Sequence, residues 1–273
     1  MAADLHAHSR VSDGCLSPAE LVELARQRDL ATLALSDHDT MQGVAEAISR
    51  GQQIGVRVLP AVEISCEEGD AEYHLLGYCL DRDNEPLRLR LAGLRRSREQ
   101  RAERIVAQLE SVGVGIELAR VREIAESGAI GRPHVARALV EAGYAQNVRE
   151  AFALWLVRGQ PGYVPREKIS VAEAIVLIHG AQGVAVWAHP GQEIQQLAKL
   201  DWLMALGLDG IEVYHPDHHR QLRAYLERLA QSNQLLITGG SDFHCPGESA
   251  DLGSYTVSEA AVERLMERAE RHA

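Results

Sequence analysis

The stretch Asp4-Leu5-His6-Ala7-His8 lies in a run of residues typical of a buried β-strand, residues 3–8. Alternate side chains of a strand point to the same face, so His6 and His8 form a pair aimed in one direction. A similar pair, Asp242 and His244, follows another strand-like run far along the chain. We infer that the two pairs share one site at the ends of strands.

Further clusters of the same kind stand where other strand-like runs end. They are Asp37-His38-Asp39, Glu63, His74 and His189. Imidazole nitrogens and carboxylate oxygens suit manganese, iron or zinc, and one carboxylate can bridge two ions. A single His-x-His pair is more often structural, but burying so many imidazoles and carboxylates without a cation would be costly. The sequence therefore predicts a metal site without cysteine ligands.

Strand-like and helical patterns alternate over much of the chain. The strand-like runs cover residues 3–8, 31–36, 56–65, 72–79, 183–188, 210–214, 235–238 and 254–257. Helical patterns lie between many of them, for example at residues 17–28, 171–180 and 216–232. Ligands at the ends of successive strands are what a (β/α) barrel places on its catalytic face. We therefore expect an α/β fold of the barrel type.

This alternation breaks between residues 85 and 162. The segment contains four helical patterns, at residues 85–112, 116–126, 133–141 and 148–156, and no convincing strand. We predict that residues 98–162 form a small all-helical insert that contributes to substrate binding, and that residues 1–97 and 163–273 form the barrel. Residues 86–137 hold eleven Arg and six Glu. Most of these arginines belong on a solvated helix face, but the insert also offers guanidinium groups to an anionic substrate.

Composition limits the classes of function. The chain has 273 residues, of which 46% are hydrophobic, and a net charge of -11. The negative charge argues against nonspecific binding of DNA. There is no signal-peptide pattern and no run of about 18 uncharged apolar residues. The four cysteines lack metal-type spacing. We expect a cytoplasmic protein with free thiols, no membrane association and no obligate protein partner.

The order of the clusters is specific. The motifs are Asp4-Leu5-His6-Ala7-His8-Ser9, Asp13-Gly14, Ser36-Asp37-His38-Asp39-Thr40, Glu63, His74, Ala188-His189-Pro190 and Gly240-Ser241-Asp242-Phe243-His244. Over nearly the whole chain this order resembles the polymerase and histidinol phosphatase (PHP) family of metal-dependent phosphoesterases. The resemblance implies a distorted barrel of seven strands, (β/α)7. Gly131-Arg132-Pro133-His134 and Tyr214-His215-Pro216-Asp217-His218 are similar to the branch with nucleoside 3',5'-bisphosphate phosphatases and a 5'-to-3' exoribonuclease.

The resemblance also implies how the metal ligands are divided. One ion would be held by His6, His8, Glu63 and Asp242, a second by Glu63, His74 and His189, and a third by Asp13, His38 and His244. It thus implies two or three divalent ions, with manganese favoured and iron or zinc as alternatives. Some family members carry histidine in place of Asp13, so an oxygen ligand there weakens the third site or favours manganese.

Other residues are expected beside the metals. Arg132 and His134 begin a predicted helix with Pro133 at its first position, and they form a candidate phosphate hook, for which the alternative is an ordinary helix start. Lys168 and His215 are further candidates for phosphate binding. We place Asp13, His38 and His218 in the catalytic set, with His218 as a general acid. Asp37 and Asp39 are expected to orient ligands or to cap.

The resemblance implies hydrolysis of a phosphate ester by metal-activated water. The favoured substrate is a small phosphorylated nucleotide, with removal of the 3'-phosphate from a nucleoside 3',5'-bisphosphate. Alternatives within the phosphoesterases are exoribonuclease action on a short RNA 5' end and hydrolysis of histidinol phosphate. Outside that class, the sequence leaves open a metal-dependent C–N hydrolase and a noncatalytic PHP binding module.

Overall fold

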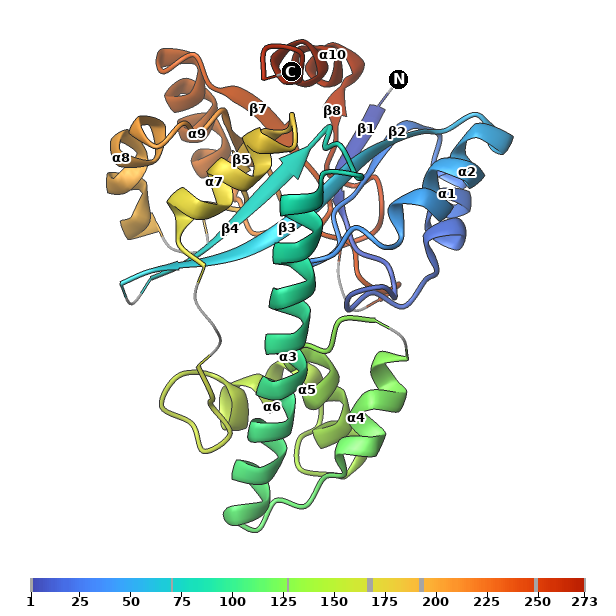
Figure 1. Ribbon diagram of the computed structural model, residues 1–273, viewed down its shortest axis with the longest axis vertical. Coiled ribbons are helices and arrows are strands. Elements are labelled where there is room, and N and C mark those ends of the chain that lie inside the picture. The colour runs from blue at the N-terminus through green and yellow to red at the C-terminus, as the bar shows by residue number, and fades with distance from the viewer. Residues whose placement is uncertain are drawn as a thin grey trace.

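The computed structural model describes residues 2–69, 71–126, 128–165, 169–191, 194–247 and 250–272. One sheet forms its centre, in the strand order β7-β6-β5-β4-β3-β2-β1-β8. The strands are β1 (Ala2–Ala7), β2 (Leu30–Leu35), β3 (Arg57–Glu68), β4 (Ala71–Tyr78), β5 (Val184–Trp187), β6 (Gly210–Tyr214), β7 (Leu236–Gly239) and β8 (Val257–Ser258). The sheet curls into a nearly closed barrel with helices around it (Figure 1).

Strand direction explains why the barrel is distorted. Most neighbouring strands are parallel, but β4 runs antiparallel to both β3 and β5. The two-residue strand β8 pairs antiparallel with the start of β1. Parallel strands covered on both faces need continuous apolar sequence, and β5, Val-Ala-Val-Trp, is buried throughout. The predicted α/β barrel is confirmed, although the sheet adds a short eighth strand to the seven that the resemblance implied.

Helices cover the outside of the barrel. They are α1 (Pro18–Gln27), α2 (Val44–Ile54), α7 (Val171–Gly180), α8 (Leu200–Ala205), α9 (Arg220–Ser232) and α10 (Glu259–Ala269). The helix predicted at residues 216–232 begins later, because His219 caps it by accepting a hydrogen bond from the Leu222 amide. Helix α8 was not predicted. None of the described helices is long and apolar enough to span a bilayer.

The barrel closes where β1 meets the chain after β7. The His8 amide donates a hydrogen bond to the Phe243 carbonyl at 2.8 Å. A Cβ atom on Gly240 would lie only 2.3 Å from the backbone nitrogen of His6. Glycine is therefore required at this position, since any side chain would separate the two strands.

The segment between β4 and α7 is helical. It comprises α3 (Glu85–Ser111), α4 (Leu118–Ala125), α5 (Arg132–Glu141), α6 (Val148–Ala151) and a π-helix (Phe152–Leu156). Helix α3 runs from the barrel into this segment (Figure 1). The far half of α3 packs with α4, α5 and the π-helix in a hydrophobic cluster that includes Ile105, Val121, Leu139 and Leu156. All four predicted helices are present, whereas the domain boundaries at residues 98 and 162 stay a prediction.

Candidate metal centre

The pair at the end of β1 points inward as predicted. The His6 and His8 side chains are fully buried, and each Nε2 atom lies 3.3 Å from Oε2 of Glu63. Oδ1 of Asp242 lies 3.4 Å from Nε2 of His6 and 3.1 Å from that of His8. These four side chains, which the resemblance assigned to one ion, therefore surround one point at the barrel rim.

Glu63 faces two groups of histidines at once. Its Oε2 lies 3.0 Å from Nδ1 of His38, on the same side as the β1 pair. Its other oxygen, Oε1, lies 2.7 Å from Nδ1 of His74 and 3.0 Å from Nε2 of His189. A carboxylate with one oxygen directed at each group has the geometry needed to bridge two ions. The structure thus brings the second predicted set together as well.

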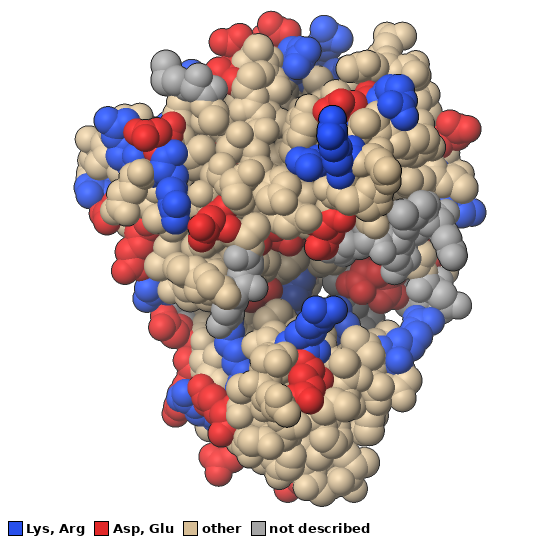
Figure 2. All heavy atoms as spheres, turned by 180° about the vertical axis from the view of Figure 1, so that it is seen from behind, with Lys and Arg blue, Asp and Glu red and all other residues tan. Residues whose placement is uncertain are grey.

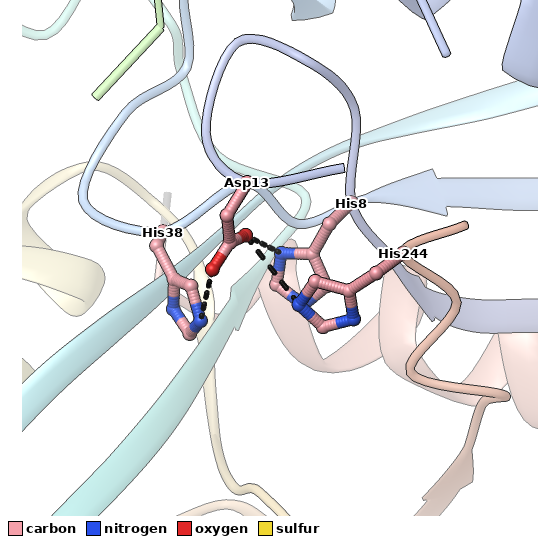
Figure 3. Close-up of side chains that lie close together, drawn as sticks. All are labelled: His8, Asp13, His38 and His244. Atoms are coloured by element: carbon pink, nitrogen blue, oxygen red, sulfur yellow. Dashed lines mark ion pairs between the residues drawn. The ribbon is translucent and has the colours of Figure 1, made fainter. Parts of the chain in front are cut away.

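Asp13 is the centre of a third group (Figure 3). Its carboxylate oxygens lie 3.4 Å from Nε2 of His244, 3.7 Å from Nε2 of His38 and 3.9 Å from Nδ1 of His8. The predicted set of Asp13, His38 and His244 is therefore together, and His8 joins it. His8 lies between this group and the group around Glu63, so the nine proposed ligands form one continuous cluster.

The unsatisfied polar atoms of this cluster fit bound cations. Among the described residues, both ring nitrogens of His8, Oδ1 of Asp13 and Nδ1 of His38 are buried and lack a hydrogen bond of acceptable geometry. Buried polar atoms are normally paired, and cations bound by Asp13, His38 and one ring nitrogen of His8 would satisfy most of these atoms. Burial lowers the pKa of His38 to about 3, so this imidazole is neutral, as a metal ligand must be. The donor set fits manganese, iron or zinc.

Glu212, in β6, lies behind the cluster and was missed by the sequence analysis. Its carboxylate accepts the Nδ1 proton of His6 at 3.0 Å and a hydrogen bond from the His189 amide at 2.8 Å. This arrangement directs the Nε2 atom of His6 toward Glu63. An acidic residue inside an otherwise apolar buried strand was the available signal.

Two proposed ligands lie on backbone that non-glycine residues rarely adopt. His189 has a φ of 30° and Asp242 a φ of 49°. Positive φ values cost conformational energy and are found where the surrounding structure holds a functional group in place. His189 lies two residues after the end of β5, and Asp242 lies three residues after the end of β7.

Asp37 and Asp39 support the site without contacting the proposed ligands' ring nitrogens. Asp37 accepts hydrogen bonds from the Ser9 amide and the Ser12 hydroxyl, both at 2.7 Å, and so fixes the loop that carries Asp13. Asp39 forms an ion pair with Arg98. The predicted supporting role is therefore one of fixing loops, not of orienting a histidine ring.

The ring nitrogens of His215 and His218 both contact other groups of the protein. Nδ1 of His218 donates to the Val213 carbonyl at 2.8 Å, and Nε2 accepts from the Gly191 amide at 3.0 Å. Both nitrogens of His218 are thus engaged by backbone groups, and its predicted role as a general acid stays a prediction. His215 lies with Nε2 3.4 Å from Oδ2 of Asp242 and is 2% exposed. His215 therefore contacts a proposed metal ligand, and its predicted role in phosphate binding stays a prediction.

The candidate phosphate hook begins helix α5. The Gly131 amide donates to Nδ1 of His134 at 2.9 Å, so in the neutral ring the proton is on Nε2. The Arg132 guanidinium lies over the ring of Phe152 and 3.8 Å from Glu72. Helix α5 also touches the metal cluster's loop, because Arg137 donates to the Asp13 carbonyl at 3.2 Å. The remaining candidate, Lys168, lies outside the described residues.

A barrel rim with buried imidazoles and carboxylates in contact is typical of metal-dependent hydrolases. The comparisons with known proteins narrow this class. The family model of the PHP domain matches residues 4–93. The chain is 36% identical over 271 residues to the 5'-3' exoribonuclease Rnm of Escherichia coli, covering 97% of this chain and 92% of the relative. It is 37% identical over 256 residues to the 3',5'-nucleoside bisphosphate phosphatase of Chromobacterium violaceum, covering 92% and 90%.

Solved structures of similar fold support the same family. A protein from Bifidobacterium adolescentis assigned as a metal-dependent phosphoesterase superimposes with a TM-score of 0.91 at 35% identity, over 97% of this chain and 96% of the other. An amidohydrolase from Chromobacterium violaceum with bound sulfate gives 0.89 at 34% identity, over the same shares. The chain belongs to the PHP family of metal-dependent phosphoesterases. It is a hydrolase acting on phosphoester bonds, which sets aside the C–N hydrolase and the noncatalytic module.

Proposed function

We propose that this protein removes the 3'-phosphate from nucleoside 3',5'-bisphosphates. The observation that carries the proposal is the position of α5, whose Arg137 contacts the loop of Asp13 while its first turn holds Arg132 and His134. One phosphate can then lie in the metal cluster and the other at the hook. A bisphosphate phosphatase and an exoribonuclease that are both more than 35% identical to this chain support a nucleotide substrate.

The hook has the chemistry to hold the 5'-phosphate. Burial lowers the pKa of His134 to about 4, so its ring is neutral at pH 7 and offers the Nε2 proton to an anion. Arg132 adds a permanent positive charge at the start of a helix, where backbone dipoles favour anions. A sulfate, which has the shape and size of phosphate, is bound in the Chromobacterium amidohydrolase and is in keeping with an anion site in this branch.

The proposed roles follow from these positions. Bound divalent ions would lower the pKa of a water molecule and neutralise charge on the phosphoryl oxygens. Glu63 would hold the two halves of the cluster together through its two oxygens. Asp13 and His38 would hold the third position, and Asp37 would keep the Asp13 loop in place. The helical segment, which we propose to be an insert at residues 98–162, would contribute the hook.

A pocket favours exoribonuclease action as a second candidate function. It has a volume of about 750 Å³ and is lined by Arg137, Arg149, Phe152 and His244, among others. Figure 2 shows a hollow with charged side chains at its edges between the barrel and the helical segment. Removing a 3'-phosphate and releasing the first nucleotide from a 5'-phosphorylated RNA break the same P–O3' bond. The RNA additionally needs room for a second nucleotide, which this pocket beside His244 would provide.

The hook is tested with Arg132→Ala. We expect kcat/KM for a nucleoside 3',5'-bisphosphate to fall about ten- to a hundredfold, because a charge-assisted hydrogen bond to phosphate is lost. Hydrolysis of a simple aryl phosphate, which has nothing to place at the hook, should change little. Both are measured at equal metal loading, with Arg104→Ala on the exposed face of α3 as the control. Equal losses on both substrates, or no loss, would remove Arg132 from the hook.

The second candidate is tested separately. Arg149→Ala should slow release of mononucleotides from a 5'-phosphorylated trinucleotide while leaving bisphosphate hydrolysis unchanged, because Arg149 lines the pocket and only the longer substrate extends into it. A wild-type protein that does not cleave the trinucleotide would leave the bisphosphate as the favoured substrate.

A further inference from the structure

Arg98 reaches from α3 into the rim of the barrel, away from the other arginines of that helix. Its Nε donates to Oδ2 of Asp39 at 2.6 Å, and its NH2 donates to the Ser65 hydroxyl at 3.3 Å. Only 13% of its side chain is exposed. Burying a guanidinium is costly, so one held here in a fixed position calls for a role.

The two partners hold Arg98 rigidly. Asp39 lies on backbone with a φ of 54°, and its second oxygen accepts a hydrogen bond from the Ser65 amide at 3.2 Å. The acceptor is thus itself fixed to strand β3. Two edges of the guanidinium are occupied by these contacts, which leaves the NH1 group.

The NH1 group of Arg98 lies beside Gly131, the residue directly before Arg132 of the hook. It lies 3.5 Å from where a Cβ atom of Gly131 would be, so the absence of a side chain at Gly131 leaves space next to it. Within the described part of the chain, NH1 has no hydrogen bond or ion pair. A rigid cation with one unused edge beside an anion site is arranged for a substrate oxygen.

The Arg98 guanidinium also lies near charged residues of the metal cluster. Burial would lower the pKa of Arg98, but Asp39, and after it Asp13 and Glu63, raise it. Arg98 therefore lies within electrostatic reach of two proposed metal ligands, Asp13 and the bridging Glu63. A phosphoryl group bound between those ligands would lie within the field of Arg98.

We propose that Arg98 binds the phosphoryl group that is transferred, with Asp39 and Ser65 as its positioning residues. This inference rests on the proposed phosphatase function of the site. NH1 would donate a hydrogen bond to a phosphoryl oxygen and stabilise the negative charge that develops there in the transition state. Arg98 and Arg132 would then have different tasks, since Arg132 would bind the phosphate that is not transferred.

The two tasks give different kinetic patterns. Arg98→Ala should lower kcat/KM by the same factor, about a hundredfold, for a nucleoside 3',5'-bisphosphate and for an aryl phosphate. Inorganic phosphate should also inhibit the variant more weakly than the wild type. Arg96→Ala is the matched control, because Arg96 lies on the same helix but is exposed. Metal content and Tm are measured for each variant.

Arg98→Lys separates binding from support of the fold. A lysine keeps the charge beside Asp39, but its single ammonium group cannot pair with Asp39 and also reach a phosphoryl oxygen. We expect a Tm close to that of the wild type together with most of the loss in kcat/KM. Asp39→Asn should reduce kcat in the same direction for both substrates.

Several results would overturn the inference. The lysine variant could have the kcat/KM of the wild type, or the alanine variant could have a lowered Tm and no loss of activity. Either result would mean that Arg98 only stabilises the contact between helix α3 and the barrel. A loss confined to the bisphosphate would move it to the hook. Failure of the proposed function would give a different result from failure of this inference. The wild type would then not hydrolyse bisphosphates, while its activity on aryl phosphates would still depend on Arg98.

Discussion

Glu212 accepts the Nδ1 proton of His6 at 3.0 Å, and this hydrogen bond turns the opposite ring nitrogen toward Glu63. A buried carboxylate thus controls a proposed ligand that it does not replace.

We predict that Glu212→Gln weakens metal binding about ten- to a hundredfold, because the His6 ring loses its charged acceptor. The apparent affinity is measured by competition with a chelator, and circular dichroism of the metal-free protein checks the fold. Affinity equal to that of the wild type would make Glu212 a packing residue only.

Glu63→Gln should lower both metal content and turnover while the fold stays intact. The reason is that Glu63 is the described carboxylate whose two oxygens face separate groups of histidines. Elemental analysis of the purified variant provides the measurement. Full metal content with unchanged activity would exclude Glu63 from the site.

Asp13→Ala should impair the third position more than the pair centred on Glu63. Asp13 lies 3.4 Å from His244 and 3.7 Å from His38 but has no contact with Glu63. We expect the variant to lose one equivalent of metal and to keep the others. Loss of all metal together would show that the positions are not independent, and loss of none would make Asp13 a loop residue.

Asp209 fastens helix α10 to the opposite end of the barrel. Burial would raise the pKa of Asp209, but hydrogen bonds from His179, the Ala185 amide and Arg268 lower it to about 2. Since the pKa of an unfolded aspartate is about 4, this group stabilises the fold above that pH and loses the effect as the pH falls toward 2.

Asp209→Asn should therefore reduce the free energy of unfolding at pH 7 by about 1 to 2 kcal/mol, after solvent screening is allowed for. The difference from the wild type should shrink as the pH is lowered from 5 to 3. Denaturant unfolding at several pH values measures this, with the exposed Asp201→Asn as control. A difference that does not change with pH would attribute the loss to packing.

Apolar runs located the strands, and several ligands follow the ends of those runs. Glu63 and His74 were wrongly predicted to do so, because they lie inside β3 and β4. His6 and His8 illustrate the limit of such inference, since their spacing showed a shared direction but not that His8 also joins the group of Asp13. That arrangement depends on how the barrel curls, which no local pattern encodes.

Arg98 and Glu212 show what sequence could not supply. Arg98 is one of seven arginines between residues 88 and 104, and only its pairing with Asp39, far away in the chain, distinguishes it from the others. Glu212 lies within a strand, whereas our search considered the ends of strands. The surroundings of His218 could not be predicted for a related reason, because a motif does not reveal the backbone groups that contact both of its nitrogens.

The contact of Gly240 with His6 has a consequence for synthesis of the protein. Ligands at the beginning of the chain meet Asp242 and His244 only when the last strands have left the ribosome and closed against the first. A nascent or truncated chain would hold at most part of the cluster. Binding of the full set of ions would thus require that translation and folding are both complete. We expect no hydrolytic activity from a fragment of the chain before that point.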